Sequence, residues 1–213
     1  MGQLPRGGPM IFDVGRAMEA QRRLAEMVVE ESLGGEPRRV CGVDVAYSGG
    51  RGFGAAVVLS YPDLEVLEVE TAEADVGVPY MPTLLAFREM PVLFRLLRKV
   101  KAKPDVYMVD GHGVYHPRRC GLATHFGVVF NVPTIGVAKG RLSVKGSEII
   151  GDAIVVGGKA LGRIFGRVYV SVGNRVTLED CVRIVSGCMR GHRVPEPLFL
   201  AHKISKEVAM LGE

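Results

Sequence analysis

The sequence lacks the features that mark several classes of protein. None of its uncharged apolar runs reaches the ~18 residues that a membrane-spanning helix requires. Residues 1–10 contain two prolines and no apolar stretch of the kind found in a secretory signal, so we expect a cytoplasmic protein with no membrane partner. The composition, 47% hydrophobic and 23% charged, excludes a disordered chain, a collagen and a coiled-coil rod.

No Cys-x-x-Cys pair or metal-finger spacing occurs among the four cysteines, which are Cys41, Cys120, Cys181 and Cys188. We therefore expect reduced thiols that are mostly buried. No internal repeat or low-complexity segment divides the chain, and 213 residues correspond to about one domain. The sequence thus predicts a single domain over residues 1–213.

The modest net charge of +4 is unevenly distributed along the chain. Residues 1–80 contain 7 Lys and Arg against 13 Asp and Glu, a net charge of −6, whereas residues 81–213 contain 20 against 10, a net charge of +10. A basic half indicates a polyanionic partner, and the alternative is a solvated surface that is basic without binding anything. Arg outnumbers Lys 19 to 8, and the guanidinium fork matches phosphate geometry well.

The hydrophobic pattern predicts a mixed α/β sheet flanked by helices. Helical periodicity covers residues 14–33, 83–101, 122–130, 178–189 and 196–211, and Pro91 should kink or split the second of these helices. Short apolar or alternating runs predict strands at 39–46, 54–59, 65–71, 105–110 and 134–138. A further hairpin-like pair of strands is expected at 153–156 and 168–172. The order βββαβαβ is typical of an α/β domain built on one mixed sheet.

Two aspartates stand inside apolar strands, where a carboxylate is costly unless it is paired or bound to a metal. Asp44 lies in the middle of the first predicted strand, and Asp110 ends the fourth, directly before a glycine. If these strands are neighbours, the two carboxylates converge, and paired carboxylates bind Mg²⁺, a hard ion that prefers oxygen ligands. The alternatives are a carboxylate paired with an arginine at Asp44 and an ordinary turn residue at Asp110.

A loop rich in glycine and cationic residues follows Asp110 and runs to Ala123, with His112, His116, Arg118 and Arg119 in it. Donors gathered beside an acid suit a phosphate backbone, although a polar surface loop would also account for them. Lys139 comes off the end of the next strand, where an ammonium could offset charge on a reacting phosphate. A solvated lysine at the end of a strand is the alternative there.

These segments together resemble the endonuclease V family, nucleases of deaminated-base repair. The resemblance covers residues 10–211, and its motifs are Gly42–Ala46, Pro79–Pro82, Leu84–Val92, Asp110–Ala123, Pro133–Lys139 and Gly191–Pro197. It implies a ribonuclease H-like fold, with a mixed five-stranded sheet flanked by helices and an extra C-terminal hairpin and helices. It also implies a metal-dependent endonuclease that acts on DNA.

The resemblance implies a role for particular residues of the reaction centre. Asp44 and Asp110 match the family's metal-binding aspartates, and Glu89 matches the helix glutamate that completes the acidic centre. His202 matches a position close to the metal, Lys139 matches the lysine near the scissile phosphate, and the loop residues His116 and Arg118 are implied as phosphate contacts. Mg²⁺ is the implied cofactor, and Mn²⁺ is expected to substitute for it.

The resemblance also implies how a damaged base is recognised. Tyr80, between Pro79 and Pro82, matches an aromatic wedge that enters the minor groove and displaces a base. The base would lie near Leu85, Gly111, Leu122 and Ala138. One departure from the family concerns Thr83, because many relatives have a glycine at that position.

The implied activity is a nick at the second phosphodiester bond 3′ to deoxyinosine, the product of adenine deamination. The nick would leave 3′-hydroxyl and 5′-phosphate ends, and we expect the enzyme to act as a monomer. Three alternatives stay open at this point. They are an endoribonuclease specific for inosine in RNA, a non-catalytic nucleic-acid-binding protein of the same fold, and a structural protein with a basic face.

Overall fold

A computed structural model describes residues 12–212. Its nine strands form one sheet in the order β3-β2-β1-β4-β5-β9-β8-β7-β6. The strands are β1 (Arg39–Ser48), β2 (Arg51–Ser60), β3 (Val66–Asp75), β4 (Val106–Asp110), β5 (Thr134–Ala138), β6 (Ser147–Ile150), β7 (Ala153–Val156), β8 (Lys159–Phe165) and β9 (Val168–Asn174). The helices are α1 (Val14–Glu26), α2 (Leu85–Leu97), α3 (Leu122–Phe130), α4 (Leu178–Gly187) and α5 (Glu196–Leu211).

The predicted five-stranded mixed sheet is confirmed as the consecutive strands β3, β2, β1, β4 and β5. Strands β1 to β3 form an antiparallel meander, while β4 lies parallel to β1 and β5 lies parallel to β4. The parallel register places Val43 beside Val109 and Asp110 beside Val137. The carboxyl ends of β1, β4 and β5 therefore point toward one region of the molecule.

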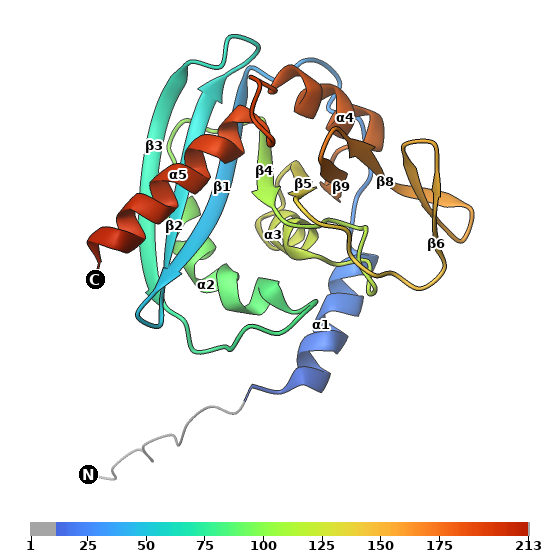
Figure 1. Ribbon diagram of the computed structural model, residues 1–213, viewed down its shortest axis with the longest axis horizontal. Helices are drawn as coiled ribbons and strands as arrows, with labels where there is room; N and C mark the ends of the chain where they lie inside the picture. Colours follow the sequence, from blue (N-terminus) through green and yellow to red (C-terminus); the bar gives the residue numbers. More distant parts are fainter. Residues whose placement is uncertain (1–11, 213) are drawn as a thin grey trace.

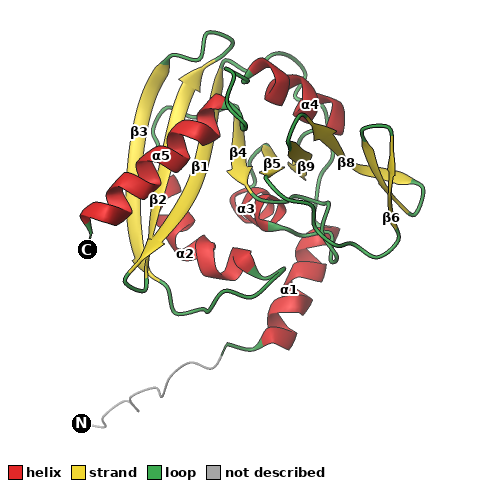
Figure 2. Ribbon diagram, in the orientation of Figure 1, coloured by secondary structure: helices red, strands yellow, loops and turns green. Residues whose placement is uncertain are grey.

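The sheet continues past β5 with four antiparallel strands, and Figure 2 shows β3 and β6 at its opposite edges. The predicted hairpin of 153–156 with 168–172 is wrong in its pairing, because β8 lies between β7 and β9. Strands β6 and β8 were not predicted. β6 is four residues long and largely exposed, so it carries little of the apolar alternation that marks a strand.

Helices cover both faces of the sheet, and each face has its own apolar core. On one face α4 and α5 pack over β-strand side chains that include Val57, Met108 and Ile135. On the other face α2 and α3 pack over a second set that includes Val43, Val58 and Val109. Figure 1 shows α5 lying across β1 and β2. As expected, all four cysteines are buried and free.

Two helices differ from the sequence prediction. α1 ends at Glu26 rather than at residue 33, because the following segment bonds to the end of β9 instead of to itself. The Val29 amide donates to Asn174 Oδ1 at 3.0 Å, and the Val29 carbonyl accepts from the Arg175 amide at 2.6 Å. α2 runs through Pro91 as a single helix, although the sequence predicted that Pro91 would kink or split it.

No helix within residues 12–212 has both the length and the apolar character needed to cross a membrane. The expectation that residues 1–10 do not form a secretory signal concerns a segment outside the described residues.

Candidate metal centre and adjoining pocket

The two strand aspartates lie close together, as predicted for neighbouring strands. Asp44 and Asp110 approach each other because β1 and β4 are parallel and their register pairs Val43 with Val109, the residues directly before them. With His202 of α5 they form a group whose potential ligand atoms all lie within 4.8 Å of one another. Three of the four predicted metal ligands are therefore brought together by the fold.

Helix α5 reaches Asp44 because its first turn lies against the backbone of β1. A side chain at Gly42 would stand 2.1 Å from the Pro197 carbonyl oxygen, so only glycine allows this approach. Farther along α5, His202 Nδ1 lies 3.2 Å from Asp44 Oδ2, and Ser205 Oγ donates to the same oxygen at 2.6 Å. Ser205 was not predicted from the sequence, where only its position about one turn after His202 indicates that it lies near the acidic group.

Glu89, the fourth predicted ligand, faces the same cleft from α2. Its side chain is buried, with 7% of the residue exposed, and Oε1 accepts a hydrogen bond from the Tyr47 hydroxyl at 3.0 Å. Burial, followed by repulsion from Asp44 and Asp110, raises the pKa of Glu89 to about 8. Glu89 lies outside the three-residue group, so its ligand role stays a prediction. Tyr47 was not predicted.

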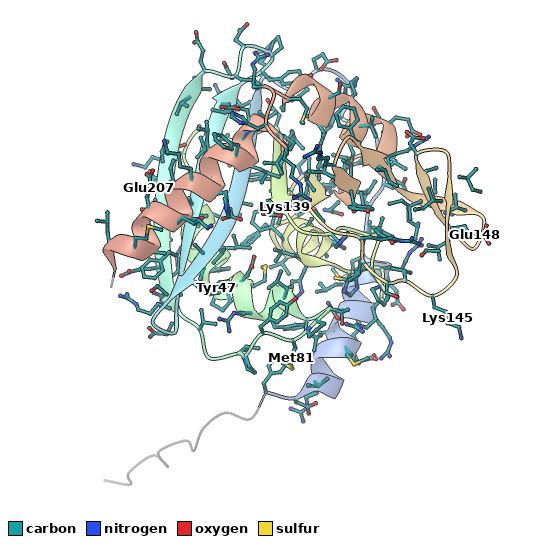
Figure 3. The ribbon with its side chains drawn as sticks, in the orientation of Figure 1. Tyr47, Met81, Lys139, Lys145, Glu148 and Glu207 are labelled. Atoms are coloured by element: carbon teal, nitrogen blue, oxygen red, sulfur yellow. The ribbon has the colours of Figure 1, made fainter. Side chains whose placement is uncertain are left out.

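Lys139 follows β5 directly and meets the acidic group from the other side. Its Nζ donates to Asp110 Oδ2 at 2.5 Å. Burial raises the pKa of Asp110, while the ammonium of Lys139 opposes that rise and the nearby Asp44 adds to it. Figure 3 labels Lys139 near the middle of the molecule. The structure thus places Lys139 next to the strand aspartates, and its position near a scissile phosphate stays a prediction.

The donor set suits a hard divalent cation. A cleft of about 590 Å³, which we call the metal cleft, is lined by residues that include Asp44, Glu89, Asp110, His202, Leu85 and Lys206. Three carboxylates crowd together there, and the raised pKa of Glu89 reflects their mutual repulsion as well as burial. A divalent cation relieves such repulsion, and oxygen ligands are those that Mg²⁺ prefers.

A second, smaller cavity adjoins the metal cleft, and we call it the side pocket. Its volume is about 130 Å³, and Leu85 lines both cavities. Of the predicted substrate contacts, Tyr80, Leu85, Gly111, His116 and Leu122 line it, whereas Pro79, Pro82, Arg118 and Ala138 do not. Thr83, whose Cβ was expected to affect the fit of the base, also lines it, and the lining residues that were not predicted are Gln21, Ala86, His112, Gly121 and Leu142.

Thr83 anchors the floor of the side pocket. Its φ angle is +69°, a left-handed value that disfavours side chains with a Cβ and favours glycine. The Thr83 carbonyl accepts hydrogen bonds from Gln21 Nε2, Arg118 and His116 Nε2 at 2.9, 3.0 and 3.1 Å. Its hydroxyl accepts a further bond from Arg118 at 2.6 Å. These contacts hold residue 83 in its unfavourable conformation.

His116 and Arg118, the two predicted phosphate contacts, are turned toward the protein. His116 is buried, and its Nδ1 accepts from the Arg118 amide while Nε2 donates to Thr83. Arg118 also donates through Nε to Gln21 Oε1 at 2.6 Å. Both side chains therefore brace the loop before α2, and a contact with phosphate stays a prediction.

Tyr80 lies at the tip of that braced loop. The residue is 67% exposed, and within residues 12–212 its ring has no aromatic or hydrogen-bonding partner. Arg88 holds the other end of the loop, because it donates to the Val78 carbonyl at 2.6 Å and stacks over the Tyr47 ring at 4.2 Å. An exposed aromatic ring on a loop that is fixed at both ends suits insertion into another molecule.

Two buried histidines and one half-buried histidine predict how stability depends on pH. Burial lowers the pKa of His112, His116 and His125 to about 4, so the unfolded chain binds more protons than the folded one between pH 4 and 6.5. Each histidine therefore destabilises the fold as the pH falls through that window, whereas the raised pKa of Glu89 acts in the opposite direction.

His125 allows this effect to be measured alone, since its Nδ1 is buried without a partner and its ring packs edge-on against Phe87. The free energy of unfolding of His125→Leu no longer depends on protonation of residue 125. Between pH 6.5 and 4 we therefore expect its slope against pH to be smaller than that of the wild type by up to about 1.4 kcal/mol per pH unit. Denaturant unfolding of the wild type and the variant at pH 7.5 and 5.0 measures the difference. Parallel pH profiles for the two proteins would contradict the expectation.

Comparisons with known proteins agree with this geometry. The Endonuclease V family profile matches residues 22–203. Endonuclease V of Thermofilum pendens is 44% identical over 204 residues, which cover 91% of this chain and 88% of that protein. Endonuclease V of Desulfurococcus amylolyticus is 41% identical, with 92% and 96% covered.

Solved structures of the same family superpose closely. Ciona intestinalis endonuclease V, in complex with a 23mer DNA containing an inosine followed by a ribo-adenosine, matches with a TM-score of 0.87 at 29% identity and covers 95% of this chain and 100% of its own. The catalytic domain of human endonuclease V matches with a TM-score of 0.85 at 33% identity, covering 93% and 96%. The resemblance in the sequence motifs is therefore confirmed: the chain belongs to the endonuclease V family and is a nuclease with a ribonuclease H-like fold.

Proposed function

We propose that this nuclease nicks DNA at the second phosphodiester bond 3′ to deoxyinosine, with Mg²⁺ as its cofactor. The observation that carries the proposal is the junction of two sites. An acidic centre and a side pocket beneath an exposed tyrosine meet at Leu85 and at the consecutive residues Asp110 and Gly111. One damaged nucleotide and a phosphate of its own strand can occupy such adjoining sites together.

The side pocket suits a base that has been rotated out of the duplex. Its walls are mostly apolar side chains and backbone, with Leu122 and Leu85 beside Gly111. An enzyme that reads a base in this way has to unstack it first, and an inserted aromatic ring supplies the displacement. Tyr80 is the exposed ring in position for that step, and Ciona intestinalis endonuclease V binds DNA that contains inosine.

The acidic centre suits phosphodiester hydrolysis. Asp44, Asp110, Glu89 and His202 would hold the cation, which when bound lowers the pKa of a water molecule and stabilises the leaving oxygen. Mn²⁺ prefers similar ligands and is expected to replace Mg²⁺. Lys139 contributes its ammonium beside Asp110, where it offsets negative charge that develops on the phosphate. Ser205 donates to Asp44 Oδ2 and so fixes the orientation of that carboxylate.

The residues proposed for the two sites lie on strands, helices and loops that pack around one continuous sheet. We propose that the enzyme works as a single domain and as a monomer.

The test is nicking of a 5′-labelled duplex with one deoxyinosine, mapped to the nucleotide in the presence of Mg²⁺. We expect one product, cut at the second phosphodiester 3′ to the lesion, and no product from the matched adenine duplex or with a metal chelator present. Equal cutting of the undamaged duplex, or cutting in chelator, would contradict the proposal.

An inosine-specific endoribonuclease is the second candidate, because the DNA bound to the Ciona intestinalis relative has a ribo-adenosine after its inosine. The same sequence prepared as DNA, as RNA and as DNA with one ribonucleotide after the lesion separates the candidates. Faster single-turnover cutting of the ribonucleotide-containing strands would favour the second.

A further inference from the structure

The metal cleft has one cationic side chain that the proposed chemistry leaves without a role. Among the described residues that line this cleft, Lys206 is the only lysine or arginine. Building on the proposed function, we propose that Lys206 binds a phosphate of the cut strand next to the phosphate that reacts. It is a substrate-binding residue in this assignment and takes no part in bond cleavage.

The geometry of α5 supports this position. Lys206 follows His202 by four residues, so the two side chains lie on the same face of the helix about 6 Å apart along its axis. His202 contacts the acidic centre through Asp44, and Met210 lines the same cleft one turn beyond Lys206. The helix thus presents a metal-centre residue, a cation and an apolar side chain in succession along the cleft.

The ammonium of Lys206 is free to meet a ligand. Throughout residues 12–212 no carboxylate forms an ion pair with it and no acceptor takes its hydrogen bond. Lys139, by contrast, is committed to Asp110 at 2.5 Å. The other lysine on this stretch of helix, Lys203, has a partner in Glu207 at 4.0 Å and does not line the cleft. Figure 3 shows Glu207 on the side of α5 away from Lys139.

Charge gives the reason for a cation at this place. Asp44, Glu89 and Asp110 repel an approaching polyanion, and the bound cation offsets that repulsion only at the reacting phosphate. The phosphates on either side need cationic partners of their own. A lysine on an exposed helix face can supply one, because its flexible side chain does not have to be held in place before the strand binds.

The experiment compares Lys206→Ala with Lys203→Ala, an exposed lysine of the same helix, in metal-free buffer. Affinity for the inosine duplex and for the matched undamaged duplex is measured by fluorescence anisotropy between 50 and 200 mM KCl. Loss of one phosphate contact lowers the slope of log K against log [salt] by about 0.9, so this fourfold rise in salt should weaken the wild type about 3.5-fold more than Lys206→Ala. The difference should be equal on both duplexes, because a phosphate contact reads no sequence.

Lys203→Ala and the conservative Lys206→Arg should keep the wild-type slope, and single-turnover nicking by Lys206→Ala at saturating enzyme should keep the wild-type rate. A wild-type slope in Lys206→Ala, or an equal loss of slope in Lys203→Ala, would overturn the assignment. If Lys206→Ala nicks more slowly than the wild type at saturating enzyme but keeps the wild-type salt slope, the assignment is also overturned, and Lys206 acts in the chemical step instead. If the wild type fails to nick inosine while the difference in slope persists, the proposed function falls and the contact with the backbone stands.

Discussion

Replacing Asp44 by asparagine is expected to lower the rate of nicking of an inosine duplex by about 10³-fold. The carboxylate lies in the three-residue group with Asp110 and His202, and it is held there by the Ser205 hydroxyl at 2.6 Å. Asparagine has the same shape and can still accept that hydrogen bond, but it removes the negative charge that holds a divalent cation. Several kcal/mol of transition-state stabilisation depend on such a cation, which corresponds to a rate change of this size. Single-turnover nicking with Mg²⁺ at saturating enzyme measures the effect.

A second readout separates loss of metal from loss of structure. Without metal, Asp44→Asn should unfold at the wild-type temperature or higher, since one of three crowded carboxylates is gone. Adding Mg²⁺ or Mn²⁺ should raise the unfolding temperature of the wild type and leave that of the variant unchanged, because a ligand that binds only the folded state stabilises it. The control is Asp75→Asn, an exposed acid at the end of edge strand β3, which should nick normally. Wild-type nicking by Asp44→Asn would remove the metal assignment.

Replacing Tyr80 by alanine is expected to reduce the preference for inosine over undamaged duplex by about 10- to 100-fold. Stacking of a base on an aromatic ring contributes about 1–3 kcal/mol, and the inserted ring also holds the displaced base out of the stack. The affinity for undamaged duplex should change little, since phosphate contacts supply non-specific binding. Equilibrium binding to both duplexes in metal-free buffer gives the ratio directly.

Tyr80→Phe is the matched control. The Tyr80 hydroxyl forms no hydrogen bond within the described residues, so the phenylalanine variant should keep the wild-type preference. Tyr80→Ala should still nick a strand that carries inosine in an unpaired bulge, where the base needs no displacement. Unchanged discrimination in Tyr80→Ala would show that the ring is not the wedge.

The sequence predicted those parts of the fold and site that depend on local pattern. An acid among the apolar residues of β1 and another at the end of β4 indicated a metal centre, and the parallel pairing of these strands brings the two acids together. Lys139 was found in the same way, as a cation directly after a buried strand. Glu89 and His202 came from the family resemblance, because nothing in the pattern of a helix distinguishes them from solvated side chains.

The parts that local pattern could not predict depend on contacts between distant segments. In the sequence, Gln21 is a polar residue that interrupts the apolar face of α1. In the structure it is buried and donates to the carbonyls of Thr83 and Cys120, which lie 62 and 99 positions away. The Tyr47 hydroxyl, near the end of β1, can donate to Glu89 only because α2 packs beside that strand. The early end of α1 likewise depends on Asn174, whose side-chain oxygen accepts the Val29 N–H in place of a helical carbonyl.

The bracing of Thr83 ties the proposed base pocket to three separate segments of the chain. Gln21 comes from α1, Thr83 from the loop before α2, and His116 and Arg118 from the loop after β4. A transplant of the Tyr80 loop alone into a protein that lacks Gln21, His116 and Arg118 would leave the Thr83 carbonyl and hydroxyl without their donors. Altering the proposed base preference of this enzyme by design therefore calls for exchanging all three segments as a unit, with the proposed metal ligands left in place.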